Sequence, residues 1–586
     1  MAEYCLDRLI LRCESEELCD DDTGVSNMKK RFLGILLVIC LMISCVTAVG
    51  FSASAQAGSE TDYGLADNCK DGNILQCFNW TLSQIKEELP NIAKAGFTSV
   101  QTSPLQRHNG GSTWYWLYQP TGFSVGNELG SYEDLKALCT EADRYGIKII
   151  VDVVANHLAG SNSGVWANNI DNDLKNASYF HNQGACSDYD NRFDLTHKNI
   201  GMPDLNSENT YVQSKVSSLI GSLKSAGVDG IRWDAAKHIS LPSENCSFFQ
   251  NVIDPDLYNY GEILGGPAGK NAGTANDSLI QEYARFFSVT DDTYSAMMIS
   301  SSRDKESDKS VGYWTTKGVS SDRVVYWGES HDTYSNTDGW TKNLDQSVVD
   351  RAYAILAARA NSQTLYLSRP FEKNYGSIFA GRKGSTHFTS KEIAAVNHFH
   401  NAMIGTEENF YATKGKFVIS RERGAVIVST NKSDVDISVK NTNGMVPSGI
   451  YTDEVTGAAF TVTQTTIKGH LGSAGIAVIY GDPEPLETTA PETQAPTSPE
   501  TEQPQTIAPE TEPQGLLRGD PDGDGIVTVI DAPLIQKKLA LISVKAFNET
   551  AADADEDGKI SVIDATQIQK FKALLPANPN IGKPIQ

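Results

Sequence analysis

The chain has 586 residues, too many for one hydrophobic core, so we expect several domains. Hydrophobic residues make up 40% of the chain and charged residues 21%, which is ordinary for a soluble globular protein. The formal net charge of -24 argues against a nucleic-acid partner, because binding to phosphates depends on clustered Lys and Arg. Such an acidic chain suits a neutral substrate, or cations such as calcium.

A targeting segment comes first in chain order. A basic stretch that ends at Arg31 precedes the apolar run Phe32–Val49, and Ala53–Ala55 has the small-residue pattern of a signal-peptide cleavage site. We therefore predict a signal peptide over residues 28–57 and assign residues 1–27 to a misplaced start codon. A membrane anchor is the alternative for the apolar run, but the small residues that follow it favour cleavage. The mature protein is expected to be secreted and to have no membrane span.

Short apolar runs then alternate with helical patterns as far as about His400. The expected strands are Ile74–Phe78, Ser99–Ser103, Ile147–Val154, Gly230–Trp233, Leu257–Gly261, Val324–Trp327 and Thr364–Leu367. Helical patterns lie between several of them, at Leu82–Ala95, Tyr132–Tyr145 and Tyr211–Ala226. Alternation of strand and helix over this length predicts an α/β fold, a (β/α)8 TIM barrel, for the domain at residues 58–407.

Residues 158–206 interrupt this alternation after the third expected strand. The segment is polar and rich in Asn and Asp. Long irregular segments inside a compact domain usually carry function. We therefore expect an excursion from the barrel that takes part in the functional site.

Beyond residue 408 the pattern changes to short strands separated by turns. The expected strands are Lys416–Ser420, Ala425–Thr430, Val435–Val439, Gly449–Thr452, Ala459–Val462 and Gly475–Tyr480. They predict a C-terminal antiparallel β-sandwich at residues 408–481. Residues 482–514 contain eight Pro, seven Thr and seven Glu and no aromatic residue, so they are expected to form an extended linker.

Four segments place ionisable residues at the ends of expected barrel strands, where the active sites of such barrels lie. They are Asp152–His157, Gly230–His238, Tyr260–Ile263 and Glu329–Asp332. An acidic residue at one strand end is often a helix cap or a surface charge. Four such segments in this order on one barrel predict a catalytic site.

In this order the four segments resemble those of the α-amylase family of retaining glycoside hydrolases, over roughly residues 70–480. The resemblance implies that Asp234 is the nucleophile, Glu262 the general acid/base, and Asp332 the third carboxylate, which stabilises the transition state. Retaining cleavage needs two carboxyl groups about 5–5.5 Å apart. Arg232, on the same strand face as Asp234, can keep that carboxylate ionised. The site should raise the pKa of Glu262, which must carry a proton.

Aromatic residues are concentrated in the loop Trp114–Pro120, which also resembles that of bacterial secreted α-amylases. Sugar rings stack on aromatic planes, and polar side-chain tips reach their hydroxyl groups. A lone histidine is more often a satisfied core residue, and only the motifs favour a binding role here. The expected substrate-binding residues are Tyr115, Tyr118, Gln119, His157, Arg232, Lys237 and His331.

The resemblance also implies one calcium ion between the barrel and the excursion. Its ligands would be Asn156, Asp204 and the backbone carbonyl of His238, with a further carbonyl near Thr196. All of these are hard oxygen donors, which calcium requires. The alternative for Asp204, which follows Pro203, is an ordinary turn residue.

A duplicated unit occupies residues 515–578, where the pattern of residues 520–525 recurs 33 residues later. Each copy has oxygen-bearing residues at positions 1, 3, 5, 9 and 12 of a calcium loop, with Asp at position 12 where the EF-hand has Glu. In the first copy these residues are Asp520, Asp522, Asp524, Thr528 and Asp531, and in the second Asp553, Asp555, Asp557, Ser561 and Asp564.

The duplication resembles the dockerin modules of cellulosome-type complexes. These are small α-helical modules whose two calcium loop–helix units bind a cohesin domain on a scaffolding protein. The resemblance implies two further calcium ions and a cohesin partner. At positions 10 and 11, where dockerins commonly have polar recognition residues, this chain has Val529-Ile530 and Val562-Ile563. A generic calcium-stabilised domain is the alternative.

Together these features predict endo-acting hydrolysis of α-1,4-glucosidic bonds in starch and related glucans, with retention. The enzyme would be secreted and held in a cohesin–dockerin complex, where a scaffolding protein can attach it to the cell surface. A glucanotransferase or maltogenic enzyme that uses the same site is the nearest alternative. A non-catalytic starch-binding subunit is another, although the presence of all three carboxylates argues against it.

Overall fold

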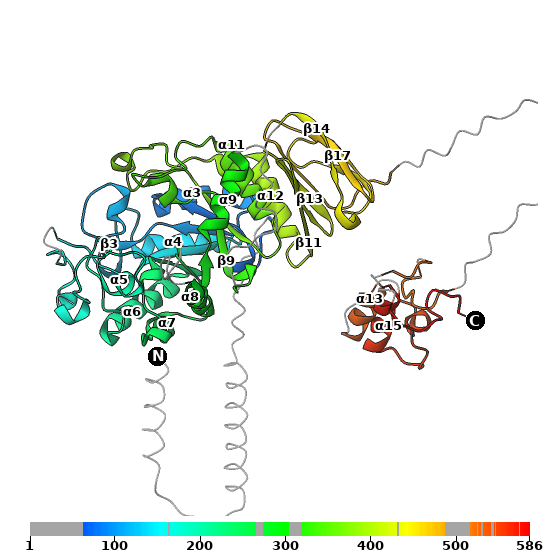
Figure 1. Ribbon diagram of the computed structural model, residues 1–586, viewed down its shortest axis with the longest axis horizontal. Helices are drawn as coiled ribbons and strands as arrows, with labels where there is room; N and C mark the ends of the chain where they lie inside the picture. Colours follow the sequence, from blue (N-terminus) through cyan, green and yellow to red (C-terminus); the bar gives the residue numbers. More distant parts are fainter. Residues whose placement is uncertain are drawn as a thin grey trace, which may run out of the picture. The chain divides into compact units, whose positions relative to one another are not determined.

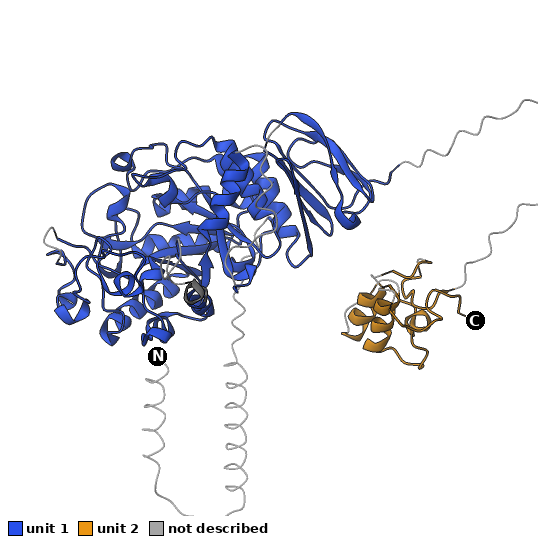
Figure 2. Cartoon of the chain, viewed as in Figure 1, with its two compact units in different colours: residues 1–488 blue, residues 489–586 orange. Residues whose placement is uncertain are grey.

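The computed structural model describes residues 62–161, 165–264, 273–303, 318–430, 433–486 and 516–585, the last range without 524, 529–530, 541–543, 545–546 and 573–574. The expected signal peptide and misplaced start, most of the linker, and Asp524, Val529 and Ile530 lie outside the described residues. The chain divides into two compact units, residues 1–488 and 489–586 (Figure 2). Each unit is described by itself.

A closed barrel of eight parallel strands forms the centre of the larger unit, in the order β1-β10-β9-β8-β7-β6-β5-β2. The strands are β1 (Ile74–Cys77), β2 (Ser99–Thr102), β5 (Lys148–Val154), β6 (Gly230–Asp234), β7 (Tyr258–Gly261), β8 (Ser288–Thr290), β9 (Val324–Trp327) and β10 (Gln363–Leu367). The predicted TIM barrel is confirmed. Every expected strand lies within one residue of its predicted bounds, and only β8 was not predicted.

Amphipathic helices surround this barrel (Figure 1). They include α3 (Leu82–Lys94), α4 (Tyr132–Asp143), α6 (Thr210–Ala226), α8 (Gly273–Phe286), α9 (Asp292–Arg303), α11 (Gln346–Ala357) and α12 (Lys391–Ala402). Local signals set their ends. A capping box formed by Thr81 and Gln84 starts α3, and Gly227 at φ 97° ends α6 in the left-handed conformation that glycine adopts easily.

Two segments extend beyond the regular barrel next to its loops. The first is the two-stranded antiparallel sheet of β3 (Gln106–His108) and β4 (Pro120–Val125), which was not predicted. The second follows β5 and contains the short helix α5 (Arg192–His197). Backbone bonds from Ala159 N–H to the Pro120 carbonyl and from Asp171 N–H to the Thr121 carbonyl, both 2.8 Å, hold the second segment against β4.

The sandwich consists of two four-stranded antiparallel sheets, β11-β12-β13-β18 and β14-β17-β16-β15. Its strands are β11 (Glu408–Thr413), β12 (Lys416–Arg421), β13 (Gly424–Ser429), β14 (Val435–Lys440), β15 (Gly449–Thr452), β16 (Ala459–Val462), β17 (Thr466–Leu471) and β18 (Ile476–Tyr480). β11 and β17 were not predicted. The buried Arg359 connects the first of these sheets to the barrel domain. Its Nε donates to Glu408 of β11 at 3.0 Å, and its Nη1 donates to the hydroxyl of Tyr294 in α9 at 2.6 Å.

The smaller unit is helical, with α13 (Asp531–Leu539), α14 (Glu549–Ala552) and α15 (Val562–Lys572). α13 packs against α15 around a small core in which Ile535 and Ile568 are fully buried. Equivalent positions of the two copies thus form one core. Within the part of the chain that the structure describes, no helix is long and apolar enough to cross a membrane.

Candidate active site

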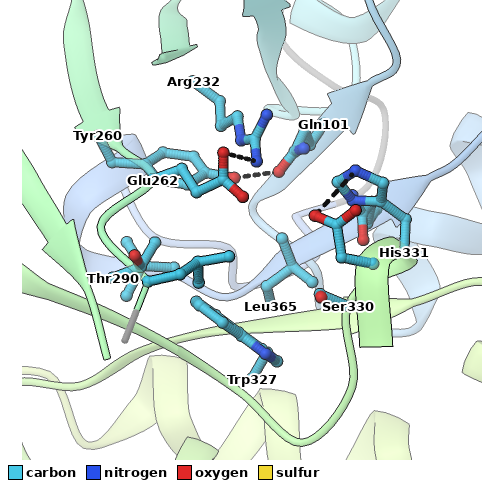
Figure 3. A pocket seen from close by; sticks show the side chains of 13 residues that line it. Gln101, Arg232, Tyr260, Glu262, Thr290, Trp327, Ser330, His331 and Leu365 are labelled. Carbon is cyan, nitrogen blue, oxygen red and sulfur yellow. Dashed lines mark hydrogen bonds and ion pairs between the residues drawn. The ribbon is translucent and has the colours of Figure 1, made fainter. Parts of the chain in front are cut away.

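A buried guanidinium at the carboxyl ends of the barrel strands holds several carboxylates together. Arg232 Nη1 donates to Asp152 Oδ1 at 2.8 Å and to Asp234 Oδ1 at 2.7 Å. Its Nη2 lies 3.2 Å from Glu262 Oε2, and Figure 3 shows the two side chains facing each other. Strand geometry explains this arrangement. Asp152 on β5 is the direct neighbour of Arg232 in the sheet, and Asp234 lies two residues further along the same face of β6.

Glu262 follows β7 and is also held by the turn after β6. The Ala235 N–H donates to Glu262 Oε2 at 2.8 Å. Ala235 has φ 49°, a left-handed conformation that residues other than glycine seldom adopt. The strained turn therefore directs a backbone N–H toward one of the two carboxylates expected to do the chemistry.

A cleft of about 370 Å³ opens above this cluster. Of the expected residues, Asp234, Glu262, Asp332, Tyr115, Tyr118, His157, Lys237 and His331 line it. The structure does not bring Arg232 and Gln119 to the cleft. Arg232 lines a smaller cavity of about 30 Å³ beneath it, where its donors are engaged by carboxylates (Figure 3). Gln119 is half-buried outside the lining of the cleft. Arg232 and Gln119 are thus not among the residues that line the substrate-free cleft, and their expected contact with the sugar stays a prediction.

Aromatic rings form one wall of the cleft. The Tyr118 ring lies parallel to the His331 ring, with 5.3 Å between centroids, and its hydroxyl donates to Asp152 Oδ2 at 3.0 Å. Tyr115 stacks on Tyr375, with 4.8 Å between ring centroids. Sequence reasoning did not identify Tyr375, which lies in an irregular segment after β10 with no motif around it. Trp114 packs edge-on against Tyr118 and, although buried, also contributes to the lining of the cleft.

Hydrogen bonds fix the ring nitrogens of both expected histidines. Gln76 Nε2 donates to His331 Nδ1 at 2.9 Å, and burial together with Arg232 lowers the pKa of His331 to about 3. His331 is therefore neutral, with its proton on Nε2, which lies 3.4 Å from Asp332 Oδ2. His157 Nε2 donates to the Tyr118 carbonyl at 3.0 Å. Gln76 on β1 was not predicted, because no motif marks it.

Lys237 lies at the other side of the cleft. Its Nζ donates to the Leu264 carbonyl at 2.8 Å, and burial lowers its pKa. One direct contact to the protein leaves the ammonium group with further donors for a ligand in the cleft.

The carboxylates of the cluster have strongly altered proton affinities. Burial raises the pKa of Asp234 and of Asp332 to about 7 each, and that of Asp152 to about 6. Burial acts in the same direction on Glu262, but Arg232 and the Ala235 amide outweigh it and hold the pKa of Glu262 below its ordinary value. The expected raised pKa of Glu262 and readily ionised Asp234 are therefore wrong for the substrate-free site. One guanidinium cannot balance the four carboxylates gathered around it, so the cluster retains protons near neutral pH.

The residues expected to hold calcium in this unit lie together where the excursion meets the barrel. The Leu205 N–H donates to the Asn156 carbonyl at 2.9 Å, and His238 Nδ1 lies 2.9 Å from the Leu195 carbonyl, next to Thr196. Asp204 is buried, and its Oδ1 has no hydrogen-bond partner within the described structure. A buried carboxylate oxygen without a donor is costly unless a cation binds it. These oxygens therefore fit calcium.

The repeat of the smaller unit also gathers carboxylates. One group is Asp520, Asp522 and Asp531, and the other is Asp553, Asp555 and Asp557, with oxygens within 4.8 Å of one another in each group. Thr528 lies beside the first group, where its hydroxyl donates to Asp531 Oδ2 at 3.0 Å. In the second copy, Ser561 N–H and Ala554 N–H donate to the two oxygens of Asp564, which does not join the group. Both groups fit calcium in their ligand type.

Asp332→Asn tests the electrostatic cost of the carboxylate cluster. Burial raises the pKa of Asp332 from 3.8 to about 7, so between these values the folded protein keeps a proton that the unfolded chain releases. The free energy of unfolding of the native protein therefore falls as the pH rises from about 4 to about 7. We expect the uncharged variant to escape this loss and to unfold at a higher urea concentration above about pH 7, with no difference below about pH 4.

Water in the cleft reduces the size of this effect, because 29% of the Asp332 side chain is exposed. Asp338→Asn is the matched control, since it removes an exposed carboxylate just after the short helix α10 (His331–Ser335) that contains Asp332. It should leave the pH dependence of unfolding unchanged. Equal pH dependence for Asp332→Asn and the native protein would contradict the prediction.

Two parts of the chain match known families. Residues 70–327 match the family described as "Alpha amylase, catalytic domain", and residues 518–571 match "Dockerin type I domain". An "Alpha-amylase" of Clostridium acetobutylicum is 34% identical over 480 residues, which are 78% of this chain and 60% of that protein. An "Alpha-amylase" of Butyrivibrio fibrisolvens is 29% identical over 507 residues, which are 74% of this chain and 51% of that protein. The chain thus spans about half to three-fifths of the length of these curated relatives.

A solved structure has the same fold. The crystal structure of a variant of α-amylase I from Eisenia fetida in complex with maltohexaose superposes with a TM-score of 0.59. The two sequences are 19% identical, and the match covers 72% of this chain and 98% of that chain. Residues 70–327 are therefore identified as an α-amylase-type catalytic domain, and residues 518–571 as a C-terminal dockerin type I domain.

Proposed function

We propose that this protein hydrolyses internal α-1,4-glucosidic bonds of starch and related glucans with retention. The observation that carries the proposal is the pair Asp234 and Glu262, which contact one guanidinium and line the same aromatic-walled cleft. Retaining cleavage needs two carboxyl groups close to each other, whereas inverting enzymes separate them to admit a water molecule. Two carboxylates joined by one arginine suit the retaining geometry.

In the first half of the reaction, Asp234 attacks the anomeric carbon and Glu262 protonates the departing oxygen. Arg232 engages Oδ1 of Asp234, which leaves the second oxygen for the sugar. The proton for Glu262 is available within the cluster, because Asp332 is hydrogen-bonded to Glu262 and has a raised pKa. In the second half, Glu262 removes a proton from water, which hydrolyses the glycosyl–Asp234 bond.

Glu262→Gln and Asp234→Asn test these roles. Each should lower the turnover of soluble starch by at least about 100-fold, because acid–base and nucleophilic groups act on the transition state. Starch affinity should change little, since ground-state binding does not depend on these groups. Release of reducing sugar and binding to immobilised starch measure the two effects. A variant that keeps a tenth of the native turnover would exclude the assigned role.

The distribution of products over time distinguishes hydrolysis from the alternatives. Cleavage of internal bonds gives a mixture of oligosaccharides early in the reaction. A glucanotransferase gives cyclic or lengthened glucans, and a maltogenic enzyme gives mainly maltose. The absence of any new reducing ends would indicate a starch-binding subunit.

Both families generally bind calcium, and we propose one ion in the catalytic domain and two in the repeat. The first would be held by Asn156, Asp204 and the carbonyl groups of Thr196 and His238. It would supply positive charge that fixes the excursion against the barrel beside His157, so the catalytic cleft depends on it indirectly. The other two would occupy the carboxylate groups of the two loops.

Removal of calcium should therefore loosen the catalytic unit. We expect a chelator to lower the temperature at which the larger unit unfolds in calorimetry, and added calcium to restore it. Asp204→Asn keeps the size of the side chain but removes a charged ligand, so calcium should stabilise this variant less. Unchanged unfolding of the native protein after measured removal of calcium would contradict the proposal.

We further propose that the protein is secreted and that its dockerin domain binds a cohesin domain of a scaffolding protein. Val562 and Ile563, at positions 10 and 11 of the second loop, are 64% and 52% exposed. Exposed apolar side chains favour a contact that buries hydrophobic area. Because Val529 and Ile530 repeat them in the first copy, one cohesin could engage either copy after a half turn of the domain.

Pairwise substitution by Asp tests the two orientations. Replacing Val562 and Ile563, or Val529 and Ile530, should change cohesin affinity little, because the other copy still binds. Replacement of all four should abolish binding, because a charged residue then occupies either contact. Affinity is measured by calorimetry with calcium present and with circular dichroism as the folding control. Complete loss from one pair in a folded domain would mean a single orientation.

A further inference from the structure

Three side chains in and just after the excursion converge beside Asp204 and are not part of the expected calcium site. They are His181, His197 and Glu208, and each offers one nitrogen or oxygen atom within 4.8 Å of the others. His181 lies in a loop, His197 is the last residue of α5, and Glu208 precedes α6. The cluster thus joins three separate segments of the chain.

Carboxylates on both sides fix the orientation of His181. Its Nδ1 lies 2.5 Å from Asp204 Oδ2, and its Nε2 lies 2.7 Å from Glu208 Oε2. Only 7% of the side chain is exposed. An Asp that accepts the Nδ1–H bond leaves Nε2 to bind a metal, which is the usual arrangement around histidine ligands. Asp204 can therefore serve calcium through Oδ1 and orient His181 through Oδ2.

His197 is held in an equally defined position. The Thr196 hydroxyl lies 2.8 Å from its Nδ1, and the exposed Phe193 ring stacks on it, with 4.4 Å between centroids. Its ring centroid is 4.6 Å from that of His181. Two imidazoles at this distance, with the Glu208 carboxylate beside them, bring two nitrogen donors and one oxygen donor within reach of one metal ion.

We propose that His181, His197 and Glu208 bind one Zn²⁺ or a similar divalent transition-metal ion. Imidazole nitrogen suits these ions, whereas calcium takes oxygen ligands only. Three protein ligands leave a coordination position for water. The ion replaces the proton between His181 Nε2 and Glu208, which is released to solution. The bound ion would cross-link the three segments that contain His181, His197 and Glu208, next to the expected calcium ligand Asp204.

A second group, Asp350, His387 and Glu392, offers a natural comparison. It contains a single imidazole, and Asp350 already accepts hydrogen bonds from Tyr366 at 2.8 Å, Gln346 at 3.0 Å and His387 at 2.9 Å. Its carboxylate is therefore engaged within the protein. The same His→Gln change can be made in both groups, which gives a matched control.

The experiment titrates Zn²⁺ into the full-length protein after chelation and dialysis against excess Ca²⁺, so that oxygen sites are filled. We expect one Zn²⁺ per chain by calorimetry and a higher temperature of unfolding. Co²⁺ in place of Zn²⁺ should give the visible absorption of a four-coordinate site. His197→Gln and Glu208→Gln should each lower the zinc affinity by more than about 100-fold, since even indirect ligands contribute 10–100-fold. His387→Gln should leave zinc binding unchanged.

Two results would overturn the proposal. One is the absence of a zinc site in the native protein under excess Ca²⁺. The other is zinc binding that survives both His197→Gln and Glu208→Gln, or that is lost in His387→Gln. Circular dichroism shows whether each variant is folded. If one of the two cluster variants does not fold, the other, together with the native stoichiometry, decides the outcome.

Discussion

The active site depends on one buried cation placed among four carboxylates. Arg232 contacts Asp152, Asp234 and Glu262 directly, and Asp332 adds a fourth negative group to the same cluster. Burial of so many charges is unfavourable unless they are well paired, and one guanidinium pairs them incompletely. Protons must make up the difference. Because the cluster has more carboxylates than positive charges, it keeps a proton near neutral pH, and this arrangement lowers the stability of the folded protein.

The same cluster positions the loops that form the cleft. Asp152 accepts the Tyr118 hydroxyl, and the carbonyl of Tyr118 accepts the His157 Nε2–H. Tyr118 also stacks on His331, which Gln76 of β1 holds in one tautomer. Loops that extend far from the sheet are therefore tied to side chains on rigid strands. This connection explains how a cleft made mostly of loop residues can keep a defined shape without a substrate.

The strands could be predicted because parallel strands are buried on both faces and appear as continuous apolar runs, such as Lys148–Val154. Ser288–Thr290 was missed because three residues with one large apolar side chain carry no such signal. The positions that we propose as catalytic were predicted from motifs at strand ends. The proton distribution did not, because it depends on how close Arg232 and the Ala235 amide come to Glu262. Contacts between distant loops, such as Tyr115 with Tyr375, leave no local pattern.

Apolar packing and polar side-chain clusters are distributed unevenly over the molecule. The barrel and sandwich depend on apolar packing, with clusters of fully buried aliphatic and aromatic side chains. The excursion adds buried apolar residues such as Leu174, Phe180 and Leu205 to the barrel cluster, and the repeat has a small apolar core of its own, but both also gather oxygen and imidazole groups. The proposed ions would add to the order that this burial gives. Because Asp204 pairs with His157 in an isolated β-bridge, the proposed calcium ion would act on the shape of the cleft through the excursion, whereas the barrel depends on apolar packing.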